Sequence, residues 1–152
     1  MKHLFAFALL CCFGYAAQAQ TQNPSYDKAL ADSLGADAYG MKQYVLAILK
    51  TGSNTTTDKE KLNAYFRGHM ENIGKLAKEG KLIVAGPLGK NDKNYRGIFI
   101  LDAKTVEEAR KMVETDPAVA AKVFDVELYP WYGSAALPVY LETHSKIEQQ
   151  KP

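Results

Sequence analysis

A histidine in the middle of the stretch 57–80 is the residue whose type and position best suit chemistry. The stretch reads TDKEKLNAYFRGHMENIGKLAKEG, and its apolar residues recur with a helical period. His69 falls on that apolar side and not on the lysine-rich side. Because imidazole exchanges protons near neutral pH, His69 is either a packed core histidine or a base that faces a pocket. The residues alone leave both alternatives open.

Four further residues are candidates for contacts with a substrate. Arg96 can bind an anionic group of a substrate, or form a salt bridge at a rim. Gly86 and Pro87 are expected to shape a pocket wall, since the chain must turn sharply there. Trp131 offers a flat apolar surface that can close a pocket, or pack at the edge of a dimer.

Several other chemistries lack the pattern they need. His3, His69 and His144 share no spacing typical of ligands, so we predict no metal site and no bound cofactor. The stretch 86–90 lacks the pattern of a phosphate-binding loop. The 19 basic and 17 acidic residues are nearly balanced and form no basic stripe with interleaved aromatic residues. Nucleic acid is therefore not an expected partner.

The first residues predict a cleavable export signal at 1–19. A short positive start precedes an apolar run at 4–16, and Ala17-Gln18-Ala19 offers the small residues that a signal peptidase reads. The run is shorter than the ~20 apolar residues of a membrane span. Cleavage after Ala19 also removes both cysteines, Cys11 and Cys12. We therefore expect a periplasmic or secreted protein without a membrane anchor after cleavage.

The remaining chain has the length of one domain with a short addition at each end. Residues 20–40 are expected to form an extension, with a short helix capped near Ser25 and stopped at Gly35, or else a disordered leader. Residues 41–137 form the domain, and 138–152 form a polar tail that can be helical.

Alternation of strand and helix patterns defines the domain. The expected elements are a strand at 41–50, a helix at 57–80, strands at 81–85 and 95–101, a helix from 105 to 116 and a strand at 124–129. Thr57 with Glu60 is a capping-box pattern, and Gly80 is typical of a left-handed helix end. Asp116-Pro117 is expected to close the second long helix.

This order predicts an α+β fold of the ferredoxin-like type, βαββαβ, with one antiparallel sheet and both helices on one face. The other sheet face would be bare in a monomer. Because the expected strands are apolar, that face should be covered, most simply by a second copy of the chain. We therefore expect a homodimer whose sheets pack face to face.

A set of short motifs resembles the YCII-related (YciI-like) domain over roughly 41–137. The motifs stand in the family's order: Arg67-x-His69, Gly80-Lys81-Leu82, Ala85-Gly86-Pro87, Arg96-Gly97-Ile98-Phe99-Ile100, Glu107-Glu108-Ala109, Asp116-Pro117 and Pro130-Trp131. The resemblance implies a dimeric α+β barrel, which agrees with the order of elements above.

The resemblance also implies a His–Asp active site, which falls on His69 and Asp116. Such a pair would act as general acid or base on a small organic substrate, in a lyase, isomerase or hydrolase type of step. In the competing interpretation, His69 is a satisfied core residue and Asp116 only ends a helix. A second hypothesis is a non-catalytic dimeric module that binds a small ligand or a protein partner.

Overall fold

The computed structural model describes residues 23–150, so the predicted export signal at 1–19 lies outside the described residues. Within 23–150, no helix combines the length and the apolar character needed to cross a membrane. The bounds of the domain's elements are β1 (Met41–Thr51), α2 (Lys59–Lys78), β2 (Leu82–Pro87), β3 (Tyr95–Leu101), α3 (Val106–Val113), α4 (Pro117–Ala120) and β4 (Phe124–Ser134). The helix α1 (Lys28–Leu34) precedes them, and a 3-10 turn, η1 (Leu137–Val139), and α5 (Tyr140–Ile147) follow.

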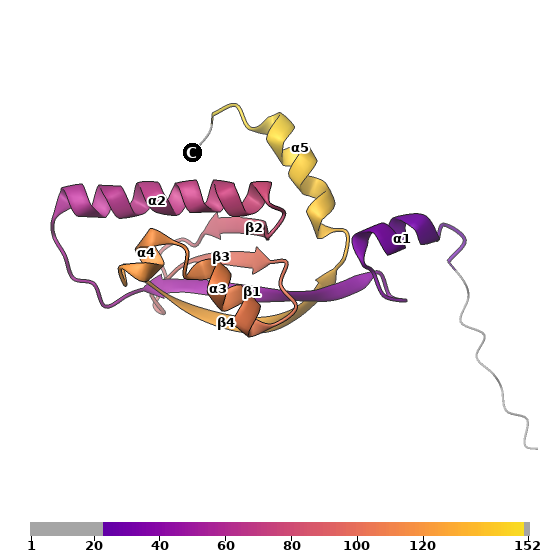
Figure 1. Ribbon diagram of the computed structural model, residues 1–152, viewed down its shortest axis with the longest axis horizontal. Coiled ribbons are helices and arrows are strands. Elements are labelled where there is room, and N and C mark those ends of the chain that lie inside the picture. Colours follow the sequence, from indigo (N-terminus) through magenta and orange to yellow (C-terminus); the bar gives the residue numbers. More distant parts are fainter. Residues whose placement is uncertain (1–22, 151–152) are drawn as a thin grey trace, which may run out of the picture.

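The four strands form one antiparallel sheet in the order β2-β3-β1-β4. Each of the two long connections places helices over the sheet, and the short helix α4 is an addition that the sequence did not predict. Figure 1 shows α2 as one long helix that runs along the sheet. The shorter helices α3 and α4 follow β3 in the sequence and precede β4. The predicted α+β, ferredoxin-like fold is confirmed.

One face of the sheet carries the main core. Alternate residues of β1, namely Val45, Ala47 and Leu49, are at most 3% exposed and point toward the helices. They pack with buried residues of β3 and of the three helices, namely Leu76, Phe99, Leu101, Ala109, Val113, Ala118 and Val119. This layer holds α2, which carries His69, on the helix-covered face of the sheet, where α2 lies beside α4 and β2.

The opposite face of the sheet has a smaller cluster, covered in part by the carboxyl-terminal segment. Tyr44, Ile83 and Ile100 are buried there, and Leu137 and Leu141 pack against them. The Tyr140 hydroxyl also donates a hydrogen bond of 2.5 Å to the Ile83 carbonyl oxygen. The remaining apolar residues of this face stay half-buried or exposed: Leu46, Ile48, Val84, Ile98 and Tyr129.

The helix α2 ends as predicted but begins one residue later than the pattern indicates. Gly80 has a φ of 69°, the left-handed conformation that follows many helix ends. At the start, Asp58 and not Thr57 is the cap, and its carboxylate accepts hydrogen bonds from the amides of Glu60 and Lys61. The predicted Thr57 cap is therefore wrong, because the adjacent aspartate is at least as good an acceptor.

The amino-terminal extension contains the predicted short helix. Gly35 ends α1 in the left-handed conformation, with a φ of 68°, but the cap is Asp27 and not Ser25. None of the residues of α1 is buried, and Figure 1 shows this helix at one end of the sheet, away from α2. The Tyr132 hydroxyl donates a hydrogen bond to Asp37, which ties the extension to β4.

The last strand is longer than predicted. The sequence pattern predicts a strand that ends at Tyr129, before Pro130, yet β4 continues to Ser134. Pro130 is opposite Val45 in the register, and β4 pairs only with β1 within the described sheet. Proline is tolerated on such an edge strand because one side of the strand needs no amide donor.

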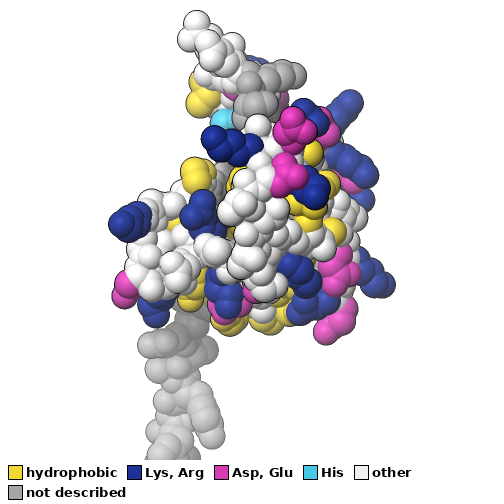
Figure 2. Space-filling view, turned by 90° about the vertical axis from the view of Figure 1, so that its left-hand side faces the viewer, with side chains coloured by type: hydrophobic (Ala, Val, Ile, Leu, Met, Phe, Trp, Pro, Cys, Tyr) yellow, Lys and Arg dark blue, Asp and Glu magenta, His cyan; other side chains and the backbone are white. Residues whose placement is uncertain are grey.

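Charges of both signs are mixed on the face of the molecule in Figure 2. Dark-blue Lys and Arg side chains lie beside magenta Asp and Glu side chains, with apolar patches between them. Exposed ion pairs within helices of the described chain include Lys28 with Asp32 and Lys146 with Glu142. Exposed pairs of this kind contribute only about 0.3–0.5 kcal/mol each, so they contribute to solubility more than to stability.

Candidate active site

His69 and Asp116 meet although 47 residues separate them in the sequence. His69 Nδ1 lies 2.5 Å from Asp116 Oδ2, so the proximity expected above is observed. Asp116 is only 2% exposed, and its other oxygen, Oδ1, accepts a hydrogen bond of 2.8 Å from the amide of Ala118. An ionised carboxylate only accepts hydrogen bonds, so the proton of this contact belongs to Nδ1 of the ring. Nε2 of a neutral His69 is then the basic nitrogen.

Asp116 is held in place because it starts a new helix. The prediction that Asp116-Pro117 closes the second long helix is wrong, because α3 already ends at Val113. Asp116 is instead the cap of α4, and Pro117 occupies the first position of that helix. Proline suits this position because its missing amide would have no partner there. A capping aspartate followed by proline is a signal that sequence reasoning could have used.

Two further contacts join α2 to the segment that carries Asp116. Asn72, one helical turn after His69, donates a hydrogen bond of 2.8 Å from Nδ2 to the Thr115 hydroxyl. On the other side of the pair, a β-carbon added to Gly68 would lie 2.8 Å from Cγ of Pro117. The His69–Asp116 pair is therefore flanked on one side by Asn72 with Thr115 and on the other by Gly68 with Pro117.

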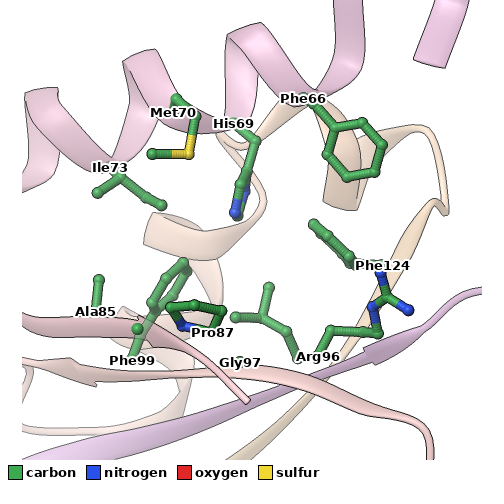
Figure 3. Close-up of a pocket in the computed structure, with 12 residues that line it drawn as sticks. Phe66, His69, Met70, Ile73, Ala85, Pro87, Arg96, Gly97, Phe99 and Phe124 are labelled. Atoms are coloured by element: carbon green, nitrogen blue, oxygen red, sulfur yellow. The ribbon is translucent and has the colours of Figure 1, made fainter. Parts of the chain in front are cut away.

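A pocket of about 360 Å³ opens beside His69, between α2 and the sheet. This volume is within the ~300–1,000 Å³ typical of small-molecule sites. Figure 3 shows His69 pointing down from α2 toward the sheet, with Phe99 and Pro87 below it. The lining residues are Leu49, Phe66, His69, Met70, Ile73, Ala85, Gly86, Pro87, Arg96, Gly97, Phe99 and Phe124.

Aromatic rings hold the imidazole in this pocket. The His69 ring stacks at 6.0 Å on Phe99 and meets Phe124 edge to face at 5.1 Å. Phe66 in turn contacts Phe124 at 5.9 Å. The His69 side chain remains 12% exposed, and Nε2 has no hydrogen-bond partner among residues 23–150. The ring is therefore held by Asp116 and by the aromatic packing, and Nε2 has no protein partner within the described part of the chain.

The domain as a whole matches a known family. The model of the YCII-related domain family matches residues 42–132, which is more than half of the chain. The chain belongs to the YCII-related domain family. The resemblance that the sequence motifs indicate is thereby confirmed, and the two members of its implied His–Asp site are the two residues that meet here.

A solved structure with some similarity to this YCII-related protein is a 5-chloro-2-hydroxyhydroquinone dehydrochlorinase from Burkholderia phenoliruptrix AC1100, in complex with 2,5-dihydroxybenzoquinone. The match has 23% sequence identity and a TM-score of 0.40, and covers 57% of this chain and 92% of that chain. No curated protein matches this chain.

Three of the four residues predicted to contact a substrate line the pocket beside His69. Gly86, Pro87 and Arg96 all line it. Trp131 does not, because its ring packs at 5.7 Å on Tyr44, on the opposite face of the sheet. The prediction that Trp131 closes the pocket is therefore not supported by its position, and the alternative, packing at the edge of a dimer, stays a prediction.

Sequence reasoning missed two of the pocket's walls. The strand patterns predict no role in the site for Phe99 and Phe124, although both contact His69. Phe99 and the buried Leu101 are two positions apart on β3 and therefore share one face of the sheet, a pattern that could have placed Phe99 on the helix side. Among the described residues, no group of three or more His, Cys, Asp or Glu side chains could hold a metal ion.

Proposed function

We propose that this YCII-related protein is a small enzyme in which His69 moves a proton on a small organic substrate and Asp116 orients His69. The observation that carries this proposal is the 2.5 Å contact between His69 Nδ1 and the buried Asp116 carboxylate, at the wall of a pocket. A buried carboxylate behind a histidine is the arrangement by which proteins fix the tautomer of a general base.

The proposed proton path uses the nitrogen of His69 that is not bonded to Asp116. Nε2 of His69 takes a proton from an acidic carbon or oxygen of the substrate, and the imidazolium that forms is stabilised by the Asp116 carboxylate. The same nitrogen then returns the proton, either to another atom of the substrate or to a leaving group. These two outcomes correspond to an isomerase and to a lyase. The apolar walls exclude water and so strengthen both the ion pair and the substrate contacts.

The half-buried apolar residues of the outer sheet face support a homodimer as part of this proposal. Ile48 and Ile98 are cross-strand partners on that face, and Leu46 lies beside them. The carboxyl-terminal segment covers only the neighbouring cluster around Tyr44. A second copy of the sheet is the simplest cover for a remaining apolar face of this kind.

Export is also part of the proposal, supported by the sequence of residues 1–19. In this view the mature protein begins at Gln20 and works outside the cytoplasm. The intact mass of the protein purified from a periplasmic or culture fraction tests this directly. A mass that still includes residues 1–19 contradicts it.

Solvent-deuterium incorporation tests the proposed function without a known substrate. Small carbonyl compounds and small organic acids are incubated with the protein in D₂O, and exchange at carbon is followed by proton NMR. We expect at least one compound to exchange faster with the protein, and His69→Asn to lower that rate by about 10²-fold or more. His144→Asn is the matched control, because His144 is exposed on α5 and outside the pocket.

The outcome for the two variants decides between an enzyme and a binding module. If His144→Asn and His69→Asn leave the exchange rate equally unchanged, the proton-transfer role of His69 is wrong. If no compound exchanges, yet small ligands bind and His69→Asn does not alter their affinity, the non-catalytic binding module is the better account.

A further inference from the structure

The two ionisable side chains that line the pocket differ in their surroundings. His69 is already bonded to Asp116, whereas Arg96 has no hydrogen bond or ion pair for its guanidinium among residues 23–150. We propose that the pocket takes a small organic anion with an apolar body about the size of one ring, whose carboxylate or phenolate binds Arg96. This inference rests on the proposed function, because it places the substrate's reacting atom at His69.

The charge of the pocket favours an anion. The lining residues include one arginine, one histidine and no carboxylate. Asp116 does not compensate for Arg96, because it lies behind the imidazole and both of its oxygens already accept hydrogen bonds. A cation would therefore meet Arg96 without a counter-charge, whereas a carboxylate or phenolate would neutralise it.

The guanidinium of Arg96, unpaired within residues 23–150, contrasts with the paired ammonium groups of two lysines on β1. Lys42 pairs with Asp102 at 2.8 Å, and Lys50 pairs with Glu127 at 2.6 Å. Figure 3 shows the Arg96 side chain rising from β3 beside Phe124, on the side of the pocket away from Ile73. Its planar guanidinium can bind both oxygens of one carboxylate, which a lysine ammonium cannot do with the same geometry.

The walls define the body of the ligand. Except for His69 and Arg96, the side chains around the pocket are apolar, and three of them are the rings of Phe66, Phe99 and Phe124. An engineered apolar cavity of about 150 Å³ in another protein binds benzene. The pocket volume of about 360 Å³ therefore holds one ring with substituents, and aromatic walls favour the face or edge of another ring.

The placement of His69 and Arg96 on different walls of the pocket lets one ligand meet both groups. His69 descends from α2, whereas Arg96 rises from β3, so the two side chains approach the cavity from its opposite walls. Phe124 lies between them and contacts His69 edge to face at 5.1 Å. A ring that packs on Phe124 would thus hold its anionic group toward Arg96 and another of its atoms toward Nε2 of His69.

Binding of benzoate, compared with its neutral isostere benzamide, tests the ligand class. The affinity of the purified protein for each compound is measured at low salt by the shifts of backbone amide signals in NMR. We expect benzoate to bind about tenfold to hundredfold more tightly than benzamide, with the largest shifts at the pocket. Arg96→Gln should abolish this preference, and Arg67→Gln, on the exposed side of α2, should keep it.

A steric variant checks the position independently of charge. Ala85 lines the pocket, so Ala85→Leu fills part of it and should weaken both compounds by a similar factor. The inference is overturned if benzamide binds as tightly as benzoate, if Arg96→Gln keeps the preference, or if benzoate does not bind at millimolar concentration. Binding does not require proton transfer, so His69→Asn should keep the preference for benzoate.

These results separate the inference from the proposed function. If no compound undergoes exchange but the preference for benzoate depends on Arg96, the anion site stands and the proton-transfer role fails. If neutral carbonyl compounds exchange at a rate that Arg96→Gln does not alter, the enzyme stands and the anionic substrate class fails.

Discussion

Pro117 of α4 lies so close to Gly68 of α2 that any larger residue at position 68 would crowd the proline ring. A β-carbon on Gly68 would lie 2.8 Å from Cγ and 3.2 Å from Cβ of Pro117. Gly68 directly precedes His69, and Pro117 directly follows Asp116. The close approach of α2 and α4 at this point therefore lets the two functional side chains reach 2.5 Å.

Alanine substitutions at two glycines of α2 test this relationship. Both exchanges improve helix propensity by about 1 kcal/mol, but only Gly68 has a neighbour in the way, since nothing lies within 4 Å of a β-carbon on Gly74. We expect Gly74→Ala to stabilise the protein. Gly68→Ala should be less stable than Gly74→Ala by about 1–3 kcal/mol in urea unfolding, because its methyl group overpacks against the proline ring. Equal stabilisation by the two substitutions would show that the contact is not tight.

The hydrogen bond between Asn72 and Thr115 is expected to couple α2 to the segment that carries Asp116. Asn72 is buried, and the Thr115 hydroxyl in turn donates a hydrogen bond of 2.7 Å to the Met112 carbonyl oxygen. Asn72→Ala should lower the free energy of unfolding by about 0.5–1.5 kcal/mol, the net contribution of one hydrogen bond, because the exposed Thr115 hydroxyl can bind water instead. A double-mutant cycle with Thr115→Val should give a coupling of about 0.5 kcal/mol or more. Strictly additive effects would contradict the coupling.

The proposed homodimer predicts that charge on the outer sheet face separates the subunits. Ile98→Lys places an ammonium group among the half-buried residues of that face. We expect light scattering to give twice the chain mass for the parent protein and one chain mass for Ile98→Lys, with circular dichroism unchanged. Ile147→Lys is the matched control, because Ile147 is 74% exposed on α5. A parent protein with the mass of a single chain contradicts the dimer.

The raised pKa of the Tyr44 phenol determines how the free energy of unfolding should respond to alkaline pH. Its burial, together with the charge of Asp102, raises the pKa of the Tyr44 phenol from 10.0 to about 12. The folded state thus favours the neutral phenol, and this contribution is full below pH ~10 and is lost as the pH rises toward ~12. Tyr44→Phe lacks this group, so its urea midpoint should fall less than that of the parent between about pH 9 and about pH 11. An identical fall in both proteins would assign the alkaline loss to other groups.

Much of the fold was accessible from the sequence because period and caps are local signals. The apolar period of α2, the left-handed Gly80 and the strand patterns predicted the order of the elements. The exact ends were less accessible where two adjacent residues compete, as Thr57 and Asp58 do at the start of α2. The length of β4 depends on its edge position, which is a property of the sheet and not of the residues around Pro130.

The site was less accessible because its parts come from different elements. Spacing alone singles out His69, but no local pattern connects it with Asp116, and only the family resemblance paired the two. The position of Trp131 depends on the register of β4, in which it is opposite Tyr44 and shares that residue's face. The aromatic contacts of His69 likewise required the packing of α2 on the sheet.

Replacement of Asp116 by asparagine tests the central claim most directly. Asparagine keeps an oxygen that can accept the hydrogen bond from Ala118, so the cap of α4 and the stability should change little. It removes the charge that fixes the tautomer of His69 and stabilises the imidazolium. The measurement is the rate of solvent-deuterium incorporation into the compound that the parent protein exchanges fastest. We predict a fall of about 10²-fold or more in Asp116→Asn at an unchanged urea midpoint. A rate within about twofold of the parent would contradict the role of the His69–Asp116 pair.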